Sequence, residues 1–220
     1  YNILYNIIKP NHDVNVVLVS PSGSGTELRR KYLDGVGIPG LFAIDKDISG
    51  DSEELVLAYC KAIGLTFSGV VRSTFKEETE TDLFGEQAVL TGSIPKIIQS
   101  SYKVLLEGGY SPAVSWLVCY YELKTIVDMF HAKGFEFMNN AISDTAEFGG
   151  ITRGNRIINQ DVKNELAKIL QEIQSGEFYL EWQKEHKEGY PNFNQMRETE
   201  KEMSIDKIGQ YMLSELFDGK

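Results

Sequence analysis

The chain has 220 residues, of which 42% are apolar and 25% are charged, and its formal net charge is −10. This composition is that of an ordinary globular protein and excludes a collagen-like, low-complexity or wholly disordered chain. The acidic balance disfavours a general nucleic-acid binder, which needs clustered Lys and Arg, and suits a protein that binds divalent cations. No apolar run reaches the ~18 residues of a membrane-spanning helix, and no signal peptide opens the chain.

The two cysteines, Cys60 and Cys119, lie in apolar surroundings and cannot form a disulfide framework. That pattern favours a reducing compartment, and we expect a cytoplasmic protein. The chain opens at Tyr1, without Met, inside what looks like folded structure. We therefore expect that an N-terminal segment of the protein precedes Tyr1.

Residues 1–75 alternate between strand and helix patterns. The run VNVVLVS at 14–20 is typical of a strand buried on both faces of a parallel sheet, and a Gly-rich turn follows it. Strand, turn and helix in this order predict an α/β unit with a parallel sheet. The other predicted elements are helices over 26–33 and 51–62 and strands over 41–44 and 66–75.

From residue 76 onward helical patterns replace the β-branched runs, so we place a domain boundary near residue 75. The segment 112–133 is apolar almost all round, which predicts a central helix. The charged segment 184–203 is predicted to lie along the surface. The predicted helices are 77–91, 94–107, 112–133, 159–175 and 205–217.

The Gly-rich turn PSGSGT at 21–26 leads from a strand into a helix. Such a turn presents backbone N–H groups to an anion at a helix N-terminus. An ordinary tight turn that needs glycine explains the same residues. The turn lacks the Lys-Ser/Thr pair of a P-loop and is not a full dinucleotide fingerprint.

Asp82 and Glu86 stand four residues apart on one predicted helix face. Two carboxylates there repel one another unless a cation lies between them, and Mg²⁺ takes oxygen ligands of this kind. A solvated acidic face is the alternative interpretation. Gly85, inside the helix, suggests that another element approaches closely.

Two further polar positions are candidates for a functional role. Glu122 lies on an otherwise apolar helix, where a carboxylate either pairs with a base or binds a metal. Ser143 and Asp144 follow a helical stretch, and the simplest role for either is a helix N-cap. The three histidines form no metal-binding spacing, and no Ser-His-Asp or Cys-His signature is present.

These segments together resemble the ketol-acid reductoisomerase family. The string TFKEETETDLFGEQAVL at 74–90 is similar to the family's metal-binding segment nearly letter for letter. The same order and spacing hold along the chain for GTELR at 25–29, GVGIP at 35–39, YELKTIVD at 121–128 and ISDTAEFG at 142–149.

The resemblance implies a partial Rossmann-like domain over 1–75. Over 76–220 it implies an interlocking helical domain like that of 6-phosphogluconate dehydrogenase. It also implies an enzyme of valine and isoleucine biosynthesis that moves an alkyl group within an acetohydroxy acid, with Mg²⁺, and then reduces the product with NADPH.

The family's functional residues map onto five positions of this chain. By resemblance, Asp82 would bridge two Mg²⁺ ions, Glu86 would complete one ion's site and Glu122 would bind the other. Ser143 would contact the substrate, and Gly25 would contact NADPH. The family's short form is an interlocked homodimer, so Glu122 and Ser143 would complete the partner's site.

The chain departs from the family at two positions. Val118 stands where the family has a second Glu, four residues before Glu122, and Ser22 stands where the family has a Lys. The family's His-Gly pair and its first βαβ unit would fall before Tyr1, so no catalytic residue is assigned within this chain. We expect Asp82, Glu86 and Glu122 to converge with at most one Mg²⁺ bound well.

Because of Val118 and Ser22, two other functions remain as alternatives. A diverged paralogue could reduce a keto acid or an imine without the second metal. A non-catalytic dimeric binding protein would need neither metal.

Overall fold

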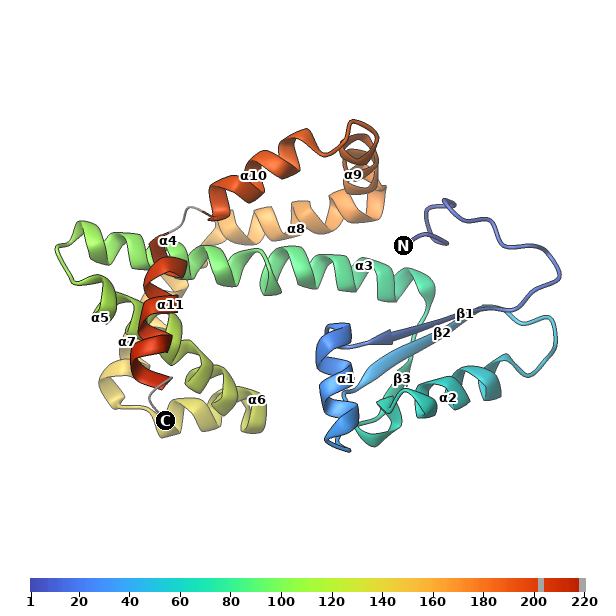
Figure 1. Ribbon diagram of the computed structural model, residues 1–220, viewed down its shortest axis with the longest axis horizontal. Coiled ribbons are helices and arrows are strands. Elements are labelled where there is room, and N and C mark those ends of the chain that lie inside the picture. The colour runs from blue at the N-terminus through green and yellow to red at the C-terminus, as the bar shows by residue number, and fades with distance from the viewer. Residues whose placement is uncertain (202–203, 218–220) are drawn as a thin grey trace. The chain divides into compact units, whose positions relative to one another are not determined.

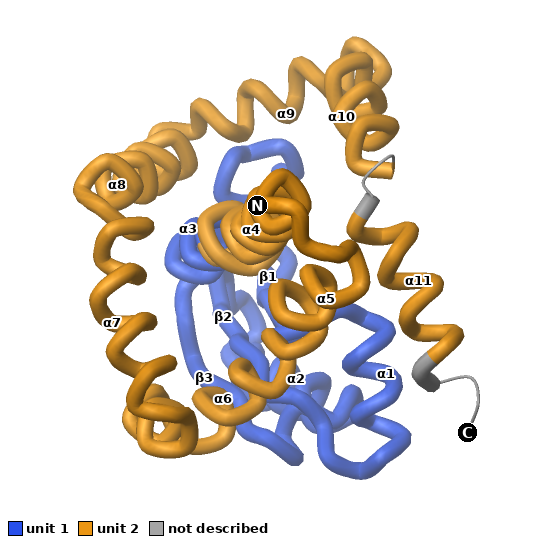
Figure 2. The backbone as a smooth tube through the Cα atoms, turned by 90° about the vertical axis from the view of Figure 1, so that its left-hand side faces the viewer, with its two compact units in different colours: residues 1–84 blue, residues 85–220 orange. Residues whose placement is uncertain are grey.

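A computed structural model describes residues 1–201 and 204–217 of the chain. The chain divides into two compact units, residues 1–84 and residues 85–220 (Figure 2). The division falls in the last turn of a helix.

Unit 1 is an α/β unit with one small sheet. Its second helix begins with an acidic first turn, which includes Glu53 and Glu54 and favours the helix start through the helix dipole. The elements are β1 (Val16–Pro21), α1 (Gly25–Leu33), β2 (Gly40–Lys46), α2 (Ser52–Ala62), the 3₁₀ turn η1 (Leu65–Phe67), β3 (Val70–Arg72) and α3 (Phe75–Gly85).

The sheet is mixed, with strand order β1-β2-β3. Strand β2 pairs parallel with β3, as predicted, but β1 pairs antiparallel with β2, from Val16 opposite Lys46 to Pro21 opposite Gly40. The prediction of a wholly parallel sheet is therefore wrong for β1. Figure 1 shows the reason: α2 runs along the sheet, whereas α1 stands across its end. With a rise of about 1.5 Å per residue, the short α1 does not carry the chain back along β1.

The core of unit 1 lies between the sheet and α2. Val56 and Cys60 are four residues apart on α2 and fully buried, and they pack with Ile38, Phe42 and Leu65. Gly37 permits this packing, because its φ is +70° and an added Cβ would lie 2.2 Å from the carbonyl oxygen of Gly64.

Unit 2 is helical, with two π-helical turns among the described residues. The predicted helices 94–107, 159–175 and 205–217 are confirmed within a residue at each end. The elements are η2 (π, Glu86–Leu90), α4 (Ser93–Glu107), α5 (Pro112–Trp116), η3 (π, Leu117–Tyr121), α6 (Glu122–Ala141), α7 (Asp144–Ile157), α8 (Gln160–Ser175), α9 (Glu177–Lys187), α10 (Pro191–Lys201) and α11 (Ser204–Phe217).

The predicted central helix 112–133 is present as α5, η3 and the first part of α6. It ends as predicted, because Gly134 interrupts α6 with φ 85° and ψ 171°. Its predicted central position is confirmed for α5, whose Ser115 and Trp116 are buried, but not for η3 and α6, which bury no residue within one chain.

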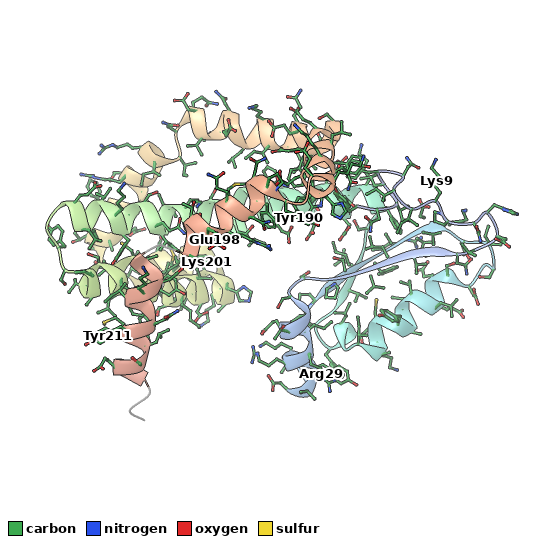
Figure 3. All side chains as sticks on the ribbon, turned by 45° about the horizontal axis from the view of Figure 1, so that its top comes forward. Lys9, Arg29, Tyr190, Glu198, Lys201 and Tyr211 are labelled. Atoms are coloured by element: carbon green, nitrogen blue, oxygen red, sulfur yellow. The ribbon has the colours of Figure 1, made fainter. Side chains whose placement is uncertain are left out.

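The core of unit 2 is small. Tyr102, Trp116, Ile205 and Met212 form its buried cluster, where α4, α5 and α11 meet. Figure 2 shows α7, α8, α9 and α10 running around the outside of the unit. The turn from α9 to α10 passes through Tyr190, whose φ is +64° (Figure 3). Helices α6, α7, α9 and α10 bury no residue within one chain.

In the described part of the chain, no helix combines the length and apolarity needed to cross a membrane.

Candidate functional site

Asp82 and Glu86 occupy successive turns of one helix. Helix α3 continues into η2 through Gly85, whose φ of −58° and ψ of −44° are helical. Both carboxylates are exposed. An added Cβ on Gly85 would meet no described atom within 4 Å, so the close approach predicted there is absent from the described part of the chain.

A π-helical turn begins at Glu86. The Glu86 carbonyl accepts from the N–H of Thr91 at 2.9 Å and of Gly92 at 3.2 Å, and from the Thr91 hydroxyl at 2.8 Å. The bond to residue 91 spans five residues, one more than in an α-helix. Turns of this kind occur often at functional sites, and no pattern in the sequence predicts this one.

Glu122 directly follows the second π-helical turn, η3. Its N–H donates to the carbonyl of Leu117, again five residues away. Glu122 is exposed, and it forms no salt bridge with a residue of the described ranges 1–201 and 204–217. The ion pair with a Lys or Arg side chain that was considered for Glu122 is therefore not seen in these ranges.

Val118 lies in η3, four residues before Glu122, and its side chain is 49% exposed. A carboxylate in its place would therefore stand at the surface near Glu122. The neighbouring Cys119 is a poor substitute for the missing ligand, because thiols suit softer metals than Mg²⁺.

The three acidic candidates are divided between the two units: Asp82 lies in unit 1, and Glu86 and Glu122 lie in unit 2. Among residues 1–201 and 204–217, no group of three or more His, Cys, Asp or Glu side chains could hold a metal ion. The predicted convergence of Asp82, Glu86 and Glu122 involves both units and stays a prediction. The donor set itself fits Mg²⁺, which takes carboxylate oxygens and keeps several waters.

Ser143 is the N-cap of α7, as the simplest interpretation predicted. Its φ of −72° and ψ of 150° are extended, and its Oγ accepts from the N–H of Ala146 at 3.3 Å. The cap uses a lone pair of the hydroxyl oxygen and leaves its hydrogen able to donate. Ser143 is exposed, so that hydrogen can reach a ligand.

The Gly-rich turn leads from β1 into α1. Ser24 is the N-cap of α1 and accepts from the N–H of Glu27, while Gly25 is the first helical residue. A groove of about 290 Å³ lies beside it and is lined by Gly25, Leu28, Arg29, Tyr32, Ala62 and Ile63. Arg29 lies 5.8 Å from the ring centre of Tyr32 and projects from α1 in Figure 3. The turn thus places an exposed glycine and a cation beside one groove.

Comparison with known proteins accounts for both units. The family model "Acetohydroxy acid isomeroreductase, NADPH-binding domain" matches residues 1–69, and the model "Ketol-acid reductoisomerase, C-terminal domain" matches residues 75–216. The chain is 47% identical over 209 residues to the ketol-acid reductoisomerase (NADP(+)) of Methanothermobacter thermautotrophicus, and 44% identical to that of Methanocaldococcus jannaschii. These alignments cover 95% of the chain but only 64% and 63% of the two relatives.

A solved structure has the same fold. It is the structure of an NADH-preferring ketol-acid reductoisomerase from an uncultured archaeon, with a TM-score of 0.94 and 39% sequence identity. The match covers 98% of the chain and 65% of that protein. It confirms the predicted fold class, a partial Rossmann-like sheet followed by a helical domain. The chain belongs to the ketol-acid reductoisomerase family and spans slightly less than two thirds of the relatives that it matches.

Proposed function

We propose that this chain is part of a ketol-acid reductoisomerase that converts acetohydroxy acids in valine and isoleucine biosynthesis. The observation that carries the proposal is the family match over 75–216, which includes Asp82 and Glu86 on successive helical turns. Bound Mg²⁺ would polarise the carbonyl and alkoxide oxygens of the substrate, and bound NADPH would supply the hydride. We propose that the NADP-binding domain spans residues 1–75 and the helical domain 76–220.

Each retained residue has a role that its position allows. Asp82 and Glu86 present carboxylate oxygens from one helix, and Glu122 presents a third from the start of α6. Ser143, fixed as a helix N-cap, would donate its hydroxyl hydrogen to the substrate. Gly25, with nothing within 4 Å of an added Cβ, would let the phosphates of NADPH approach the N-terminus of α1.

The active site would be shared by two chains of a homodimer. Helix α6 buries none of its residues, and large apolar side chains of α6 and α7 are exposed, including Phe135 at 68% and Phe148 at 65%. Exposed apolar surface of this kind marks an interface. The partner's Glu122 and Ser143 would then complete the site that Asp82 and Glu86 begin. Because Cys60 and Cys119 are both free thiols, we place the dimer in the cytoplasm.

Val118 favours a second candidate function. A valine supplies no oxygen ligand, so a second Mg²⁺ would lose one charged ligand and need water in its place. Alkyl migration needs that ion more than simple reduction does. A paralogue that only reduces a keto acid or an imine would keep Asp82, Glu86 and Ser143 and tolerate Val118. Loss of both reactions would leave a dimeric binding protein.

A paired assay on the full-length protein separates these functions. One arm supplies an acetohydroxy acid, which requires migration and reduction, and the other supplies the 2-keto acid that follows migration. Each arm is run with NADPH and with NADH. We expect turnover in both arms, with the first arm slower. Reduction without migration would support the paralogue, and no turnover in either arm would contradict an enzyme.

Mixed dimers test the shared site. Asp82→Asn and Glu122→Gln each inactivate every site in their own homodimers. If one site takes Asp82 from one chain and Glu122 from the other, each mixed dimer keeps one intact site, and random mixing restores about a quarter of the wild-type activity. No recovery after unfolding and refolding the two variants together would contradict a site shared in this way. Recovery in the wild-type control shows that refolding works.

A further inference from the structure

Both π-helical turns of the described chain lie beside a proposed metal ligand. Turn η2 begins at Glu86, and turn η3 ends directly before Glu122. A π-helical turn makes weaker backbone packing than an α-helix, so it persists only where neighbouring groups stabilise it. For η2, those groups are visible.

Three consecutive residues, Thr91, Gly92 and Ser93, hold the C-terminal end of η2, and we call them the 91–93 collar. The Glu86 carbonyl receives three donors from the collar, namely two N–H groups and the Thr91 hydroxyl. The Ser93 hydroxyl donates to the carbonyl of Ala88, two residues after Glu86. The collar therefore closes the turn with side-chain as well as backbone hydrogen bonds.

Glycine is the only residue type that this closure accommodates at position 92. A Cβ added to Gly92 would lie 1.8 Å from the carbonyl oxygen of Gln87 and 2.9 Å from its carbonyl carbon. Both atoms belong to the backbone of η2, so a side chain could fit only if the turn opened. The φ of Gly92 is negative, so it is this contact that requires glycine.

We infer that the 91–93 collar positions Glu86 as a Mg²⁺ ligand, with Thr91 and Gly92 as positioning residues. The inference rests on the proposed function, in which Glu86 binds the metal. The collar holds the Glu86 carbonyl, which fixes the ψ angle of Glu86 and thereby the direction of its side chain relative to the chain that follows it, η2 and α4. Mg²⁺ demands near-octahedral oxygens at about 2.0–2.1 Å, so a small displacement of one carboxylate weakens binding.

The test measures Mg²⁺ affinity by calorimetric titration of the full-length protein and, separately, thermal unfolding in the presence of EDTA. Thr91→Val removes the hydroxyl bond and keeps the shape of the side chain. Thr91→Ser keeps the hydroxyl. Thr199→Val is the matched control, because the Thr199 hydroxyl donates to the carbonyl of Gln195 in the same manner, on α10. Gly92→Ala is the more severe variant.

We expect Thr91→Val to weaken Mg²⁺ binding about tenfold, the size typical of a residue that orients a metal ligand, and Thr91→Ser to restore it. Thr199→Val should leave the affinity unchanged. If Thr91→Val lowers only the unfolding temperature and leaves the Mg²⁺ affinity as in the wild type, the collar is merely structural and the inference is wrong. Should Gly92→Ala fail to fold, the three threonine variants still decide the matter.

An Asp82→Asn variant distinguishes a failure of this inference from a failure of the proposed function. If the wild type binds Mg²⁺ and Asp82→Asn does not, the metal site stands, and the threonine variants test the collar alone. If the wild type binds no Mg²⁺ that depends on Asp82, the proposed function fails first, and the role of the collar fails with it.

Discussion

Two helical segments carry the proposed metal ligands. Both contain a π-helical turn, but they differ in their acidic side chains. The segment of α3 and η2 keeps both Asp82 and Glu86, whereas the segment of η3 and α6 keeps Glu122 but has Val118 four residues earlier. Each segment contains a π-helical turn beside its glutamate. The second segment therefore has the same local backbone feature but lacks one of the proposed ligands. A change in metal binding in this chain should follow from one side chain and not from a different fold.

Asp82→Asn should give the largest effect, because Asp82 lies in the complete segment and is proposed to contact both ions. We expect Mg²⁺ affinity to fall about 100-fold, since loss of a ligand costs at least as much as loss of a group that orients one. Isothermal titration of the full-length protein measures it. Glu77→Gln is the control, as Glu77 is exposed on the same helix and bonds only locally to Ser73. Equal affinities in both variants would show that α3 does not hold the metal.

Val118→Glu should restore the incomplete segment. The new carboxylate would stand at the surface four residues before Glu122, so we expect the second Mg²⁺ to bind about tenfold more tightly. The isomerisation arm of the paired assay should gain more than the reduction arm. Val118→Gln has the same size without the charge and should give a smaller gain. An unchanged second site in Val118→Glu would contradict the assignment of this position.

Gly134→Ala probes the end of the second segment. Gly134 adopts φ 85° and ψ 171°, a region that residues with a Cβ essentially avoid, and the rings of Phe130 and Phe135 pack across the break with centres 4.9 Å apart. We expect the free energy of unfolding to fall by roughly 1–3 kcal/mol. Gly150→Ala, inside α7 with open space at its Cβ, should cost nothing. Urea unfolding at one fixed protein concentration measures both, and equal stability of the two variants would contradict the account.

Sequence patterns predicted most of the elements and missed details that depend on pairing. The helix with Asp82 and Glu86, the helix end at residue 133 and the N-cap at Ser143 all depend on neighbours within a few residues, and the structure has them. The antiparallel pairing of β1 was missed because an apolar run such as 14–20 fits either direction of pairing, and only Val16 of this run is buried. Helices α9 and α10 were missed because their charged sequence lacks a clear apolar face.

The candidate site was harder to predict than the fold. Shifting a hydrogen bond from four to five residues leaves the apolar pattern of a helix nearly intact, so neither π-helical turn was visible in the sequence. Gly92 lies between the predicted helices 77–91 and 94–107, where a glycine indicates only a helix break. Gly85 lies inside a predicted helix, yet it faces open space in the described chain, whereas an added Cβ on Gly92 would meet the Gln87 carbonyl. Only the backbone geometry shows that a close contact requires glycine at position 92 and not at position 85.

The most direct test of the account is the number of Mg²⁺ ions that the wild-type full-length protein binds tightly per active site. In the proposed site, Asp82, Glu86 and the partner's Glu122 would form one set of oxygen ligands, and Val118 would leave the other set without one ligand. We predict one tightly bound Mg²⁺ and a second that binds much more weakly, together with slow isomerisation and faster reduction of the 2-keto acid. Two equally tight ions with equally fast reactions would contradict the account.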